Sequence, residues 1–300
     1  MQRLISVIGA PSSIGIRPYD DGGARRLDLA PAALREQNLV ARLAARDLGD
    51  VTPLPYRDFV RAPGRVRNAD GVAGYSRELA ARVAAAADGG AFVLVLGGDC
   101  SIVLGCLLGA GRGDRAIGLA YVDAHADFAA PEESRTGSAA SMCLALAVGR
   151  GDTPLARLGA EPLVAAADVA LVARRDHAEP WYGHAALRAA PILDLPHDAV
   201  RDRGPAAAAQ DVLGRVARPD LSGFWIHVDA DVLDPSVVPA VDSPVPGGLA
   251  LDELTELLRP LVQHPQALGL ELTIYDPTLD PERTSAARLA ELLERVLGRP

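Results

Sequence analysis

Short apolar runs alternate with longer amphipathic stretches along this chain of 300 residues. The short runs, rich in Val, Ile and Leu, are predicted to be strands at residues 4–8, 91–96, 117–122, 169–172, 191–193, 223–228 and 267–272. The longer stretches, rich in Ala, Leu and Arg, are predicted to be helices at residues 70–87, 101–108, 139–148, 204–216, 251–261 and 282–297. Because strand and helix follow each other repeatedly, the pattern indicates an α/β fold with a parallel sheet covered on both faces.

The chain shows no internal repeat and no low-complexity linker. Two stretches rich in Pro and Gly, residues 50–65 and 235–248, are short and are interrupted by apolar residues. We therefore predict one domain over residues 1–300, since α/β folds of this length are often a single domain. In open α/β sheets ligands bind beyond the carboxyl ends of the strands, so the residues that follow each strand are the candidates for function.

Residues 121–127 read YVDAHAD at the end of a predicted strand. Asp123, His125 and Asp127 alternate with small residues, and if the strand continues locally, its period of two places all three side chains on one face. An isolated pair of aspartates would more often cap a helix or mark an exposed turn. Two carboxylates alternating with an imidazole at one strand end, together with a second pair of aspartates at another, favour a metal-ligand set instead.

Residues 225–235 read WIHVDADVLDP and follow another apolar run. Asp229 and Asp231 share a face by the same rule, with His227 directly upstream on that face. Unpaired carboxylates at the buried end of a strand would each cost on the order of several kcal/mol, and converging carboxylates would also repel one another. One or two divalent cations would resolve both problems, and oxygen-rich ligation with one imidazole suits Mn²⁺ or a similar ion.

A third strand end reads LGGDCS at residues 96–101. Its glycines allow a tight turn into the next helix and a close approach of the backbone. Asp99 or Ser101 could cap that helix. Taken alone, the motif leaves Cys100 open to two interpretations, an ordinary buried thiol or a ligand.

Composition removes several functional classes. A formal charge of −9 argues against nucleic acid as the main partner, because phosphate binding requires a basic surface. All 30 basic residues are arginine, which excludes P-loop ATPases and pyridoxal or Schiff-base enzymes, since both need a lysine. Three cysteines without disulfide or CxxC spacing suit a reducing compartment.

No window approaches the roughly 18–20 apolar residues of a membrane span, and the N-terminus lacks a signal-peptide design, so we expect a cytoplasmic protein.

Together the three motifs, GGDCS, then DAHAD, then DADVLDP, resemble the arginase, agmatinase and formiminoglutamase superfamily of ureohydrolases in both order and spacing. Residues 9–28 and the PVPGGL stretch at 244–249 extend the resemblance over nearly the whole chain. It implies a three-layer αβα sandwich with a mostly parallel sheet of about eight strands. It also implies a hydrolase of carbon–nitrogen bonds in linear amidines (a ureohydrolase or amidinohydrolase, agmatinase-like) and a homo-oligomer, a trimer or hexamer.

The resemblance further implies roles for the candidate residues. Two Mn²⁺ ions are expected, with Asp127 and Asp229 bridging or clasping both, Asp123 as a second bridging ligand, and His125 and Asp231 on one ion. A hydroxide between the ions would attack the carbon of a guanidinium or amidine. Asp127 would carry the proton to the leaving amine, and Glu271 would be a catalytic acid near the metals.

Cys100 stands where the family usually has a histidine ligand. We still predict that Cys100 binds metal, and a thiolate shifts the preference toward Zn²⁺, Fe²⁺ or Ni²⁺. His227 could supply the missing imidazole. The interpretation we favour is that His227 is a hydrogen-bond partner of a ligand instead.

Two further departures concern the substrate. The family's proton-shuttling histidine falls at Ala140, and the glutamate that holds the guanidinium of arginine falls at Ile274. We therefore expect a small guanidino or amidine substrate other than L-arginine. Alternatives are a degenerate member that binds metal for structure or regulation, and a related amide deacetylase. Candidates for contacting the rest of the substrate are Arg175, Asp176, His177 and Glu179. The alternative interpretation of this stretch is an ordinary exposed polar loop. Glu132, Glu133 and Arg135 could line the mouth of the site, although such polar residues are common on any loop.

Overall fold

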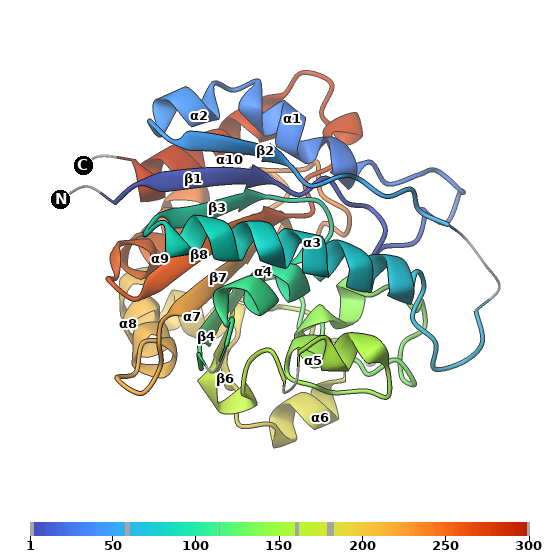
Figure 1. Ribbon diagram of the computed structural model, residues 1–300. Coiled ribbons are helices and arrows are strands. Elements are labelled where there is room, and N and C mark those ends of the chain that lie inside the picture. The colour runs from blue at the N-terminus through green and yellow to red at the C-terminus, as the bar shows by residue number, and fades with distance from the viewer. Residues whose placement is uncertain (1–2, 58–60, 114, 160–161, 179–182, 299–300) are drawn as a thin grey trace.

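Eight parallel strands form one sheet in the order β2-β1-β3-β8-β7-β4-β5-β6 (Figure 1). The computed structural model describes residues 3–57, 61–113, 115–159, 162–178 and 183–298. The strands are β1 Ile5–Gly9, β2 Arg46–Asp50, β3 Phe92–Leu96, β4 Gly118–Val122, β5 Val169–Val172, β6 Leu193–Leu195, β7 Phe224–Asp229 and β8 Ala267–Thr273. The predicted α/β class with a parallel sheet of about eight strands is confirmed.

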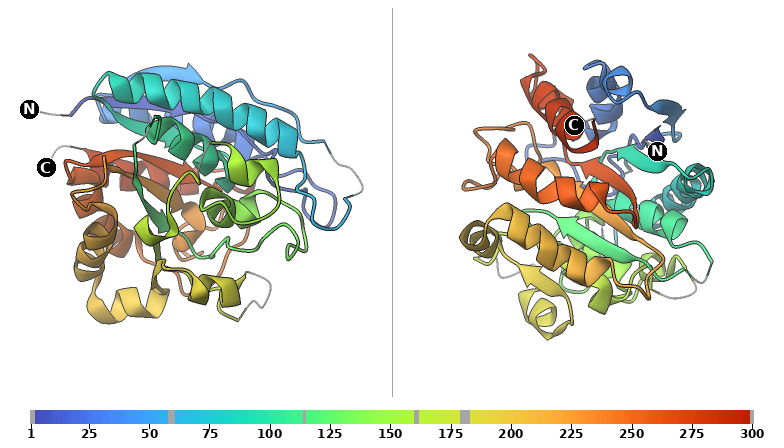
Figure 2. Two further views of the ribbon diagram at one scale, coloured as in Figure 1. Left: turned by 60° about the horizontal axis from the view of Figure 1, so that its bottom comes forward. Right: turned by 90° about the vertical axis from the view of Figure 1, so that its left-hand side faces the viewer.

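Helices cover both faces of this sheet. Helices α3, α4 and α5 lie on one face, and α8, α9 and α10 lie on the other (Figures 1 and 2). The α-helices are α1 Ala30–Arg35, α2 Leu39–Arg42, α3 Ala69–Asp88, α4 Val103–Ala110, α5 Cys143–Ala147, α6 His184–Ala189, α7 His197–Arg203, α8 Pro205–Val216, α9 Leu251–Gln263 and α10 Thr284–Leu297. Short 3-10 helices are η1 Leu27–Leu29, η2 Cys100–Ile102, η3 Ala140–Met142, η4 Pro154–Arg157, η5 Ala166–Asp168, η6 Ala230–Val232 and η7 Pro277–Leu279. No helix in the described ranges is long and apolar enough to cross a membrane.

The differences from the predicted elements occur at the edges of the sheet. Strand β2 reads RDLGD and was not predicted, because an exposed edge strand has no apolar run. At the opposite edge, β6 occupies residues 193–195 where 191–193 were predicted. Helices α1, α2, α6 and α7 have only four to seven residues each and were also missed. The central strands match well, because a strand buried on both faces is apolar throughout.

The order of the strands positions the candidate site. The chain runs from β3 to β4, but β8 and β7 lie between those two strands in the sheet. The carboxyl ends of β3, β8, β7 and β4 are therefore consecutive along one edge of the sheet. An interruption in strand order of this kind leaves a crevice at the carboxyl ends, where α/β proteins bind ligands.

The turn after β3 depends on a glycine that touches another backbone segment. A Cβ atom at Gly98 would lie 2.1 Å from the carbonyl oxygen of Ser12. The Asp99 amide donates to this same oxygen at 3.0 Å, so the two segments cannot separate easily. The Asp99 side chain accepts a hydrogen bond from the amide of Ser101 and caps the following 3-10 helix.

We expect Gly98→Ala to lower the free energy of unfolding by about 1–3 kcal/mol, the usual effect of overpacking. Denaturant unfolding of the metal-free protein measures this change. Gly74→Ala is the matched control, because Gly74 lies within α3 with no atom near the added methyl group. That control should gain about 0.5–1 kcal/mol. Equal stability of both variants would contradict the tight contact at Gly98.

Candidate metal centre

The three sequence motifs meet at the carboxyl ends of three strands, β3, β7 and β4, which lie close together in the sheet with only β8 between β3 and β7. Cys100 begins η2 after β3, Asp123 follows β4, Asp229 ends β7, and Asp231 lies in η6. Strand β4 ends at Val122, as predicted, and Asp127 has a left-handed backbone with φ of 46°, so the condition that the strand continues locally through residue 127 is not met. These side chains converge because of the turns at the strand ends and the order of the strands.

Two overlapping groups of donor atoms form within this edge. The first consists of Cys100, Asp123, His227 and Asp229, and the second of Asp123, His125 and Asp231. Within each group the donor atoms lie within 4.8 Å of one another, and every residue is buried. Asp123 belongs to both groups, so the predicted role of a shared ligand is compatible with its position.

Individual distances show how closely the groups are packed. His125 Nδ1 lies 2.9 Å from Asp231 Oδ2 and 3.6 Å from Asp123 Oδ1. The Cys100 thiol donates to Asp229 Oδ2 at 2.9 Å. The other Asp229 oxygen accepts from the Asp231 amide at 2.8 Å. A backbone amide thus orients the Asp229 carboxylate, and the side-chain atoms that could bind a metal lie close to one another.

The charges in this cluster are poorly compensated by protein groups alone. Burial, followed by the carboxylates of Asp231 and Asp123, raises the pKa of Asp229 well above its usual range. Burial also raises the pKa of Asp231, with Asp123 adding to the effect. Burial opposes ionisation of Asp123 too, but the imidazoles of His125 and His227 outweigh it and bring the pKa of that carboxyl to about 2.

The residues fit one or two divalent cations. Among the described residues, buried side-chain atoms without a hydrogen-bond partner include three in this region: Asp123 Oδ2, His227 Nε2 and Glu271 Oε2. Such atoms are rare in proteins unless an ion or water satisfies them. Carboxylates and imidazole suit Mn²⁺, whereas the thiol of Cys100 favours softer ions.

Asp127 belongs to neither donor group, and its carboxylate is held by hydrogen bonds from two buried side chains. Its Oδ2 atom accepts hydrogen bonds from the Tyr121 hydroxyl at 2.8 Å and the Cys143 thiol at 3.3 Å. Burial, then the nearby Asp123 carboxylate, raises the pKa of Asp127 to about 8. Tyr121 and Cys143 were not predicted as site residues. Tyr121 could have been found, because it lies two residues before Asp123 and faces the same side of the sheet.

Glu271 is fully buried on β8 and approaches the cluster through His227. Its Oε1 atom lies 2.8 Å from His227 Nδ1. Glu271 belongs to neither donor group of the described residues. Glu271 therefore contacts the candidate metal ligands only through His227.

Two of the residues predicted to contact the substrate form hydrogen bonds to the segments that carry the candidate ligands. The Arg175 guanidinium donates to the carbonyl oxygens of Asp231 and Val245, both at 2.7 Å. Asp176 is buried and accepts from the Ala126 amide at 2.8 Å. These contacts hold the ligand-bearing loops.

His177 is exposed, and Glu179 lies outside the described residues. Among the described residues that line the two cavities at the site, neither Arg175, Asp176 nor His177 appears.

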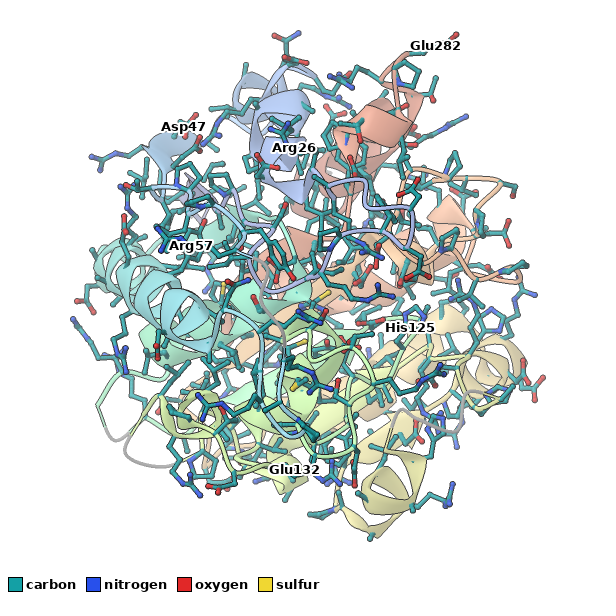
Figure 3. The ribbon with its side chains drawn as sticks, turned by 90° about the vertical axis from the view of Figure 1, so that its right-hand side faces the viewer. Arg26, Asp47, Arg57, His125, Glu132 and Glu282 are labelled. Atoms are coloured by element: carbon teal, nitrogen blue, oxygen red, sulfur yellow. The ribbon has the colours of Figure 1, made fainter. Side chains whose placement is uncertain are left out.

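Two cavities open at this edge of the sheet, and Figure 3 places His125 near the centre of that face. The inner cavity, of about 180 Å³, is bounded by candidate ligands together with Ala140, Asp242 and Ile274. Ile274 has a left-handed backbone with φ of 68°, which is rare for a β-branched side chain. Backbone strain of this kind concentrates at functional sites.

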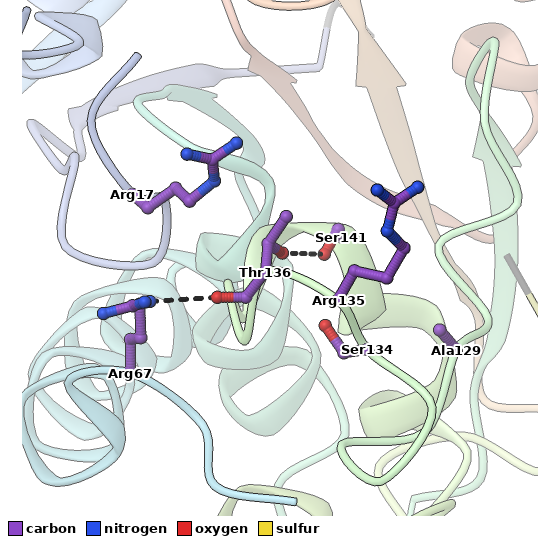
Figure 4. A pocket seen from close by; sticks show the side chains of 7 residues that line it. All are labelled: Arg17, Arg67, Ala129, Ser134, Arg135, Thr136 and Ser141. Carbon is purple, nitrogen blue, oxygen red and sulfur yellow. Dashed lines mark hydrogen bonds between the residues drawn. The ribbon is translucent and has the colours of Figure 1, made fainter. Parts of the chain in front are cut away.

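The outer cavity, of about 400 Å³, is rich in arginine (Figure 4). Arg17, Thr136 and Ser141 line both cavities, so the two are neighbours. The remaining lining residues of the outer cavity are Arg67, Ala129, Ser134 and Arg135. Arg135 therefore takes the position at the mouth that its loop suggested. Arg17 and Arg67 come from distant segments and gave no local signal.

Comparisons with known proteins agree over the whole chain. The model of the arginase family matches residues 3–298. The arginase of Bacillus subtilis is 29% identical over 308 residues, which cover 100% of this chain and 99% of that protein. The solved arginase of Bacillus caldovelox superposes with a TM-score of 0.87 at 29% identity, over 100% and 99% of the two chains. Proclavaminate amidino hydrolase of Streptomyces clavuligerus shares the fold, with a TM-score of 0.74 at 20% identity over 99% and 91% of the chains. The predicted resemblance is confirmed.

Proposed function

Because the chain belongs to the arginase family, we propose that it hydrolyses a carbon–nitrogen bond in a linear amidine or guanidino compound other than L-arginine. The observation that carries this proposal is the pair of buried donor groups that share Asp123 beside a cavity. Divalent cations held there by Cys100, Asp123, His125, Asp229 and Asp231 would lower the pKa of a coordinated water and so supply a nucleophile near neutral pH.

Asp127 is suited to move the proton in this reaction. Its carboxylate lines the inner cavity, so it can contact both the attacking water and the leaving amine. The Tyr121 hydroxyl and the Cys143 thiol both bind Oδ2, which leaves Oδ1 for proton transfer. Ala140, which also lines this cavity, has no group that could exchange a proton, so Asp127 would act without a second proton carrier at that position.

The wall of the inner cavity argues against free L-arginine. Ile274 lines it with an apolar side chain that cannot pair with a guanidinium. Among the described residues that line it, the one acidic side chain besides the candidate ligands and Asp127 is Asp242, which forms an ion pair with Arg25. A strongly cationic substrate would therefore find no uncommitted carboxylate apart from the metal ligands and Asp127, which is assigned to proton transfer.

The outer cavity favours a substrate with an anionic end. Three arginines line it together with three hydroxyl side chains and one alanine. Arg17 forms an ion pair with Asp20, but Asp20 is 89% exposed, and solvent screens such a pair strongly. A guanidino or amidino acid could place its reacting carbon in the inner cavity and its carboxylate among the arginines.

A substrate panel tests this proposal. Urea or amine release is measured for guanidino acids of increasing chain length, L-arginine, agmatine and formimino compounds, after loading with Mn²⁺ or Zn²⁺. We expect an acidic compound to have the highest kcat/KM. Faster turnover of agmatine or L-arginine would contradict the anionic preference. Firm metal binding without turnover of any compound would favour the degenerate interpretation.

For the best acidic substrate, Arg17→Gln and Arg135→Gln are each expected to raise KM about tenfold, with kcat changed less than about twofold. The reason is that a charge-assisted hydrogen bond contributes roughly 1.5–3 kcal/mol when it is formed, and solvent weakens it at the rim. Steady-state kinetics measure both constants. Arg288→Gln on the outer surface of α10 is the matched control and should leave KM unchanged. An unchanged KM in both cavity variants would remove the outer cavity from substrate binding.

A further inference from the structure

Three polar side chains form a row across the middle of the sheet, one step behind the candidate ligands. Tyr121, His227 and Glu271 are direct neighbours on β4, β7 and β8 in the strand register. Asp123 and Asp229 follow two residues later and therefore face the same side of the sheet. The row thus lies directly beneath two of the residues expected to bind metal.

The imidazole ring of His227 is held by stacking and by a hydrogen bond at Nδ1, whereas its Nε2 atom forms no hydrogen bond. The ring is fully buried and stacks on Tyr121 with ring centroids 4.1 Å apart. Its Nδ1 atom lies 2.8 Å from Glu271 Oε1, and in the tautomer that carries the proton on Nδ1 the ring donates to that carboxylate. The Nε2 atom has no hydrogen-bond partner, although it is buried. A carboxylate that orients one imidazole nitrogen and leaves the other free is the common arrangement behind a metal-binding histidine.

The Nε2 atom of His227 lies near a carboxylate oxygen that also has no hydrogen-bond partner. His227 Nε2 lies 3.7 Å from Asp123 Oδ2, and that oxygen also lacks a partner. This separation is too long for a hydrogen bond, which spans about 2.7–3.2 Å. Donors that share one small divalent ion at about 2.0–2.3 Å lie roughly 3–4 Å apart. The donor atoms of Cys100 and Asp229 complete the group within 4.8 Å.

We propose that His227 is a metal ligand and that it completes, with Cys100, Asp123 and Asp229, a site of mixed sulfur, nitrogen and oxygen donors. This inference rests on the proposed function for the presence of a metal, and it assigns the ligands of one position. Glu271 is then a positioning residue that orients the imidazole. The interpretation of His227 as only a hydrogen-bond partner of a ligand is not supported by the distance, because Nε2 lies 3.7 Å from Asp123 Oδ2 and forms no hydrogen bond with it.

The two metal positions should consequently differ in preference. The position at Cys100 and His227 offers a thiolate and an imidazole, which suit Zn²⁺ and other borderline ions. The position at Asp123, His125 and Asp231 offers carboxylates with one imidazole, which suit Mn²⁺. A single equivalent of Zn²⁺ should therefore enter the first position, and a mixed Zn²⁺ and Mn²⁺ centre should form when both ions are supplied.

X-ray absorption at the zinc edge tests this assignment on stripped protein given one equivalent of Zn²⁺. We expect the wild-type protein to show one sulfur and one imidazole bound to zinc. In His227→Asn the sulfur should remain and the imidazole should disappear. A zinc ion without a sulfur ligand would overturn the proposal. An imidazole that persists in His227→Asn would also overturn it, since His125 would then be the ligand.

Three further variants keep the test decisive. Cys100→Ser should remove the sulfur, and the His264→Asn control, remote from the site beside Phe224, should leave both signals unchanged. Glu271→Gln retains the imidazole at His227 and should weaken zinc affinity about 10–100-fold. If His227→Asn fails to fold by circular dichroism, an unchanged zinc affinity in Glu271→Gln would overturn the proposal. Turnover is not measured, so a protein that binds zinc in this way but hydrolyses nothing would contradict only the proposed function.

Discussion

Replacing Asp229 with asparagine is expected to abolish turnover, with a fall in kcat/KM on the order of a thousandfold or more. Asp229 ends β7, and its two oxygens contact the Cys100 thiol and the Asp231 amide. Its carboxylate is a member of the first donor group and adjoins the second through Asp231. Metal content by elemental analysis should fall from two equivalents to one or none.

The same variant should not unfold the protein. Asparagine keeps the size of the side chain and removes one charge from a crowded buried cluster. Burial and the neighbouring carboxylates raise the pKa of Asp229, so ionised Asp229 is unfavourable when no cation compensates it. We therefore expect the thermal midpoint of Asp229→Asn in chelator to equal or exceed that of the wild type.

The matched control is Asp211→Asn on the exposed side of α8, which should change neither metal content nor turnover. Full turnover and two metal equivalents in Asp229→Asn would disprove the metal centre. Removal of metal by a chelator should reproduce the loss of activity in the wild type, and adding Mn²⁺ or Zn²⁺ should restore it. Failure of any metal to bind the stripped wild-type protein would have the same consequence.

Asp127→Asn is expected to lower kcat by about 10²–10⁴-fold, the usual contribution of a general acid–base group. Asp127 lines the inner cavity but belongs to neither donor group of the described residues. We therefore expect this variant to keep more metal than Asp229→Asn does. Kinetics and elemental analysis of the same preparation separate the two effects. A kcat within tenfold of the wild type would transfer the proton-carrying role to another group.

A second variant tests how Asp127 is held. The Tyr121 hydroxyl donates to Asp127 Oδ2, and this bond favours the ionised carboxylate, which lowers the pKa of Asp127. Tyr121→Phe removes the bond, so the pKa of Asp127 should rise. If ionised Asp127 accepts the proton, the acid limb of the pH–activity profile should move to higher pH. An unchanged profile would show that Tyr121 only fills space.

The sequence could predict those site residues that lie close to a recognisable strand. Asp123, His125, Asp229 and Asp231 each follow an apolar run within a few residues, so their place at strand ends could be predicted. The predicted contact residues Arg175 and Asp176 lie on a loop of the same edge but are committed to holding other loops. Sequence position alone cannot distinguish a side chain that faces a cavity from one that binds a neighbouring backbone.

The amino-acid sequence by itself determined the parallel α/β architecture and most candidate ligands, because buried strands are apolar and their ends carry polar residues within a short distance. Only the tertiary structure decided which strand ends meet. The order β3-β8-β7-β4 brings Cys100 to Asp229, 129 residues later in the chain. It also directs His227 Nε2 toward Asp123 and collects Arg17 and Arg135 around one cavity. These contacts are set by the packing of distant segments against one another, which no short window of sequence encodes.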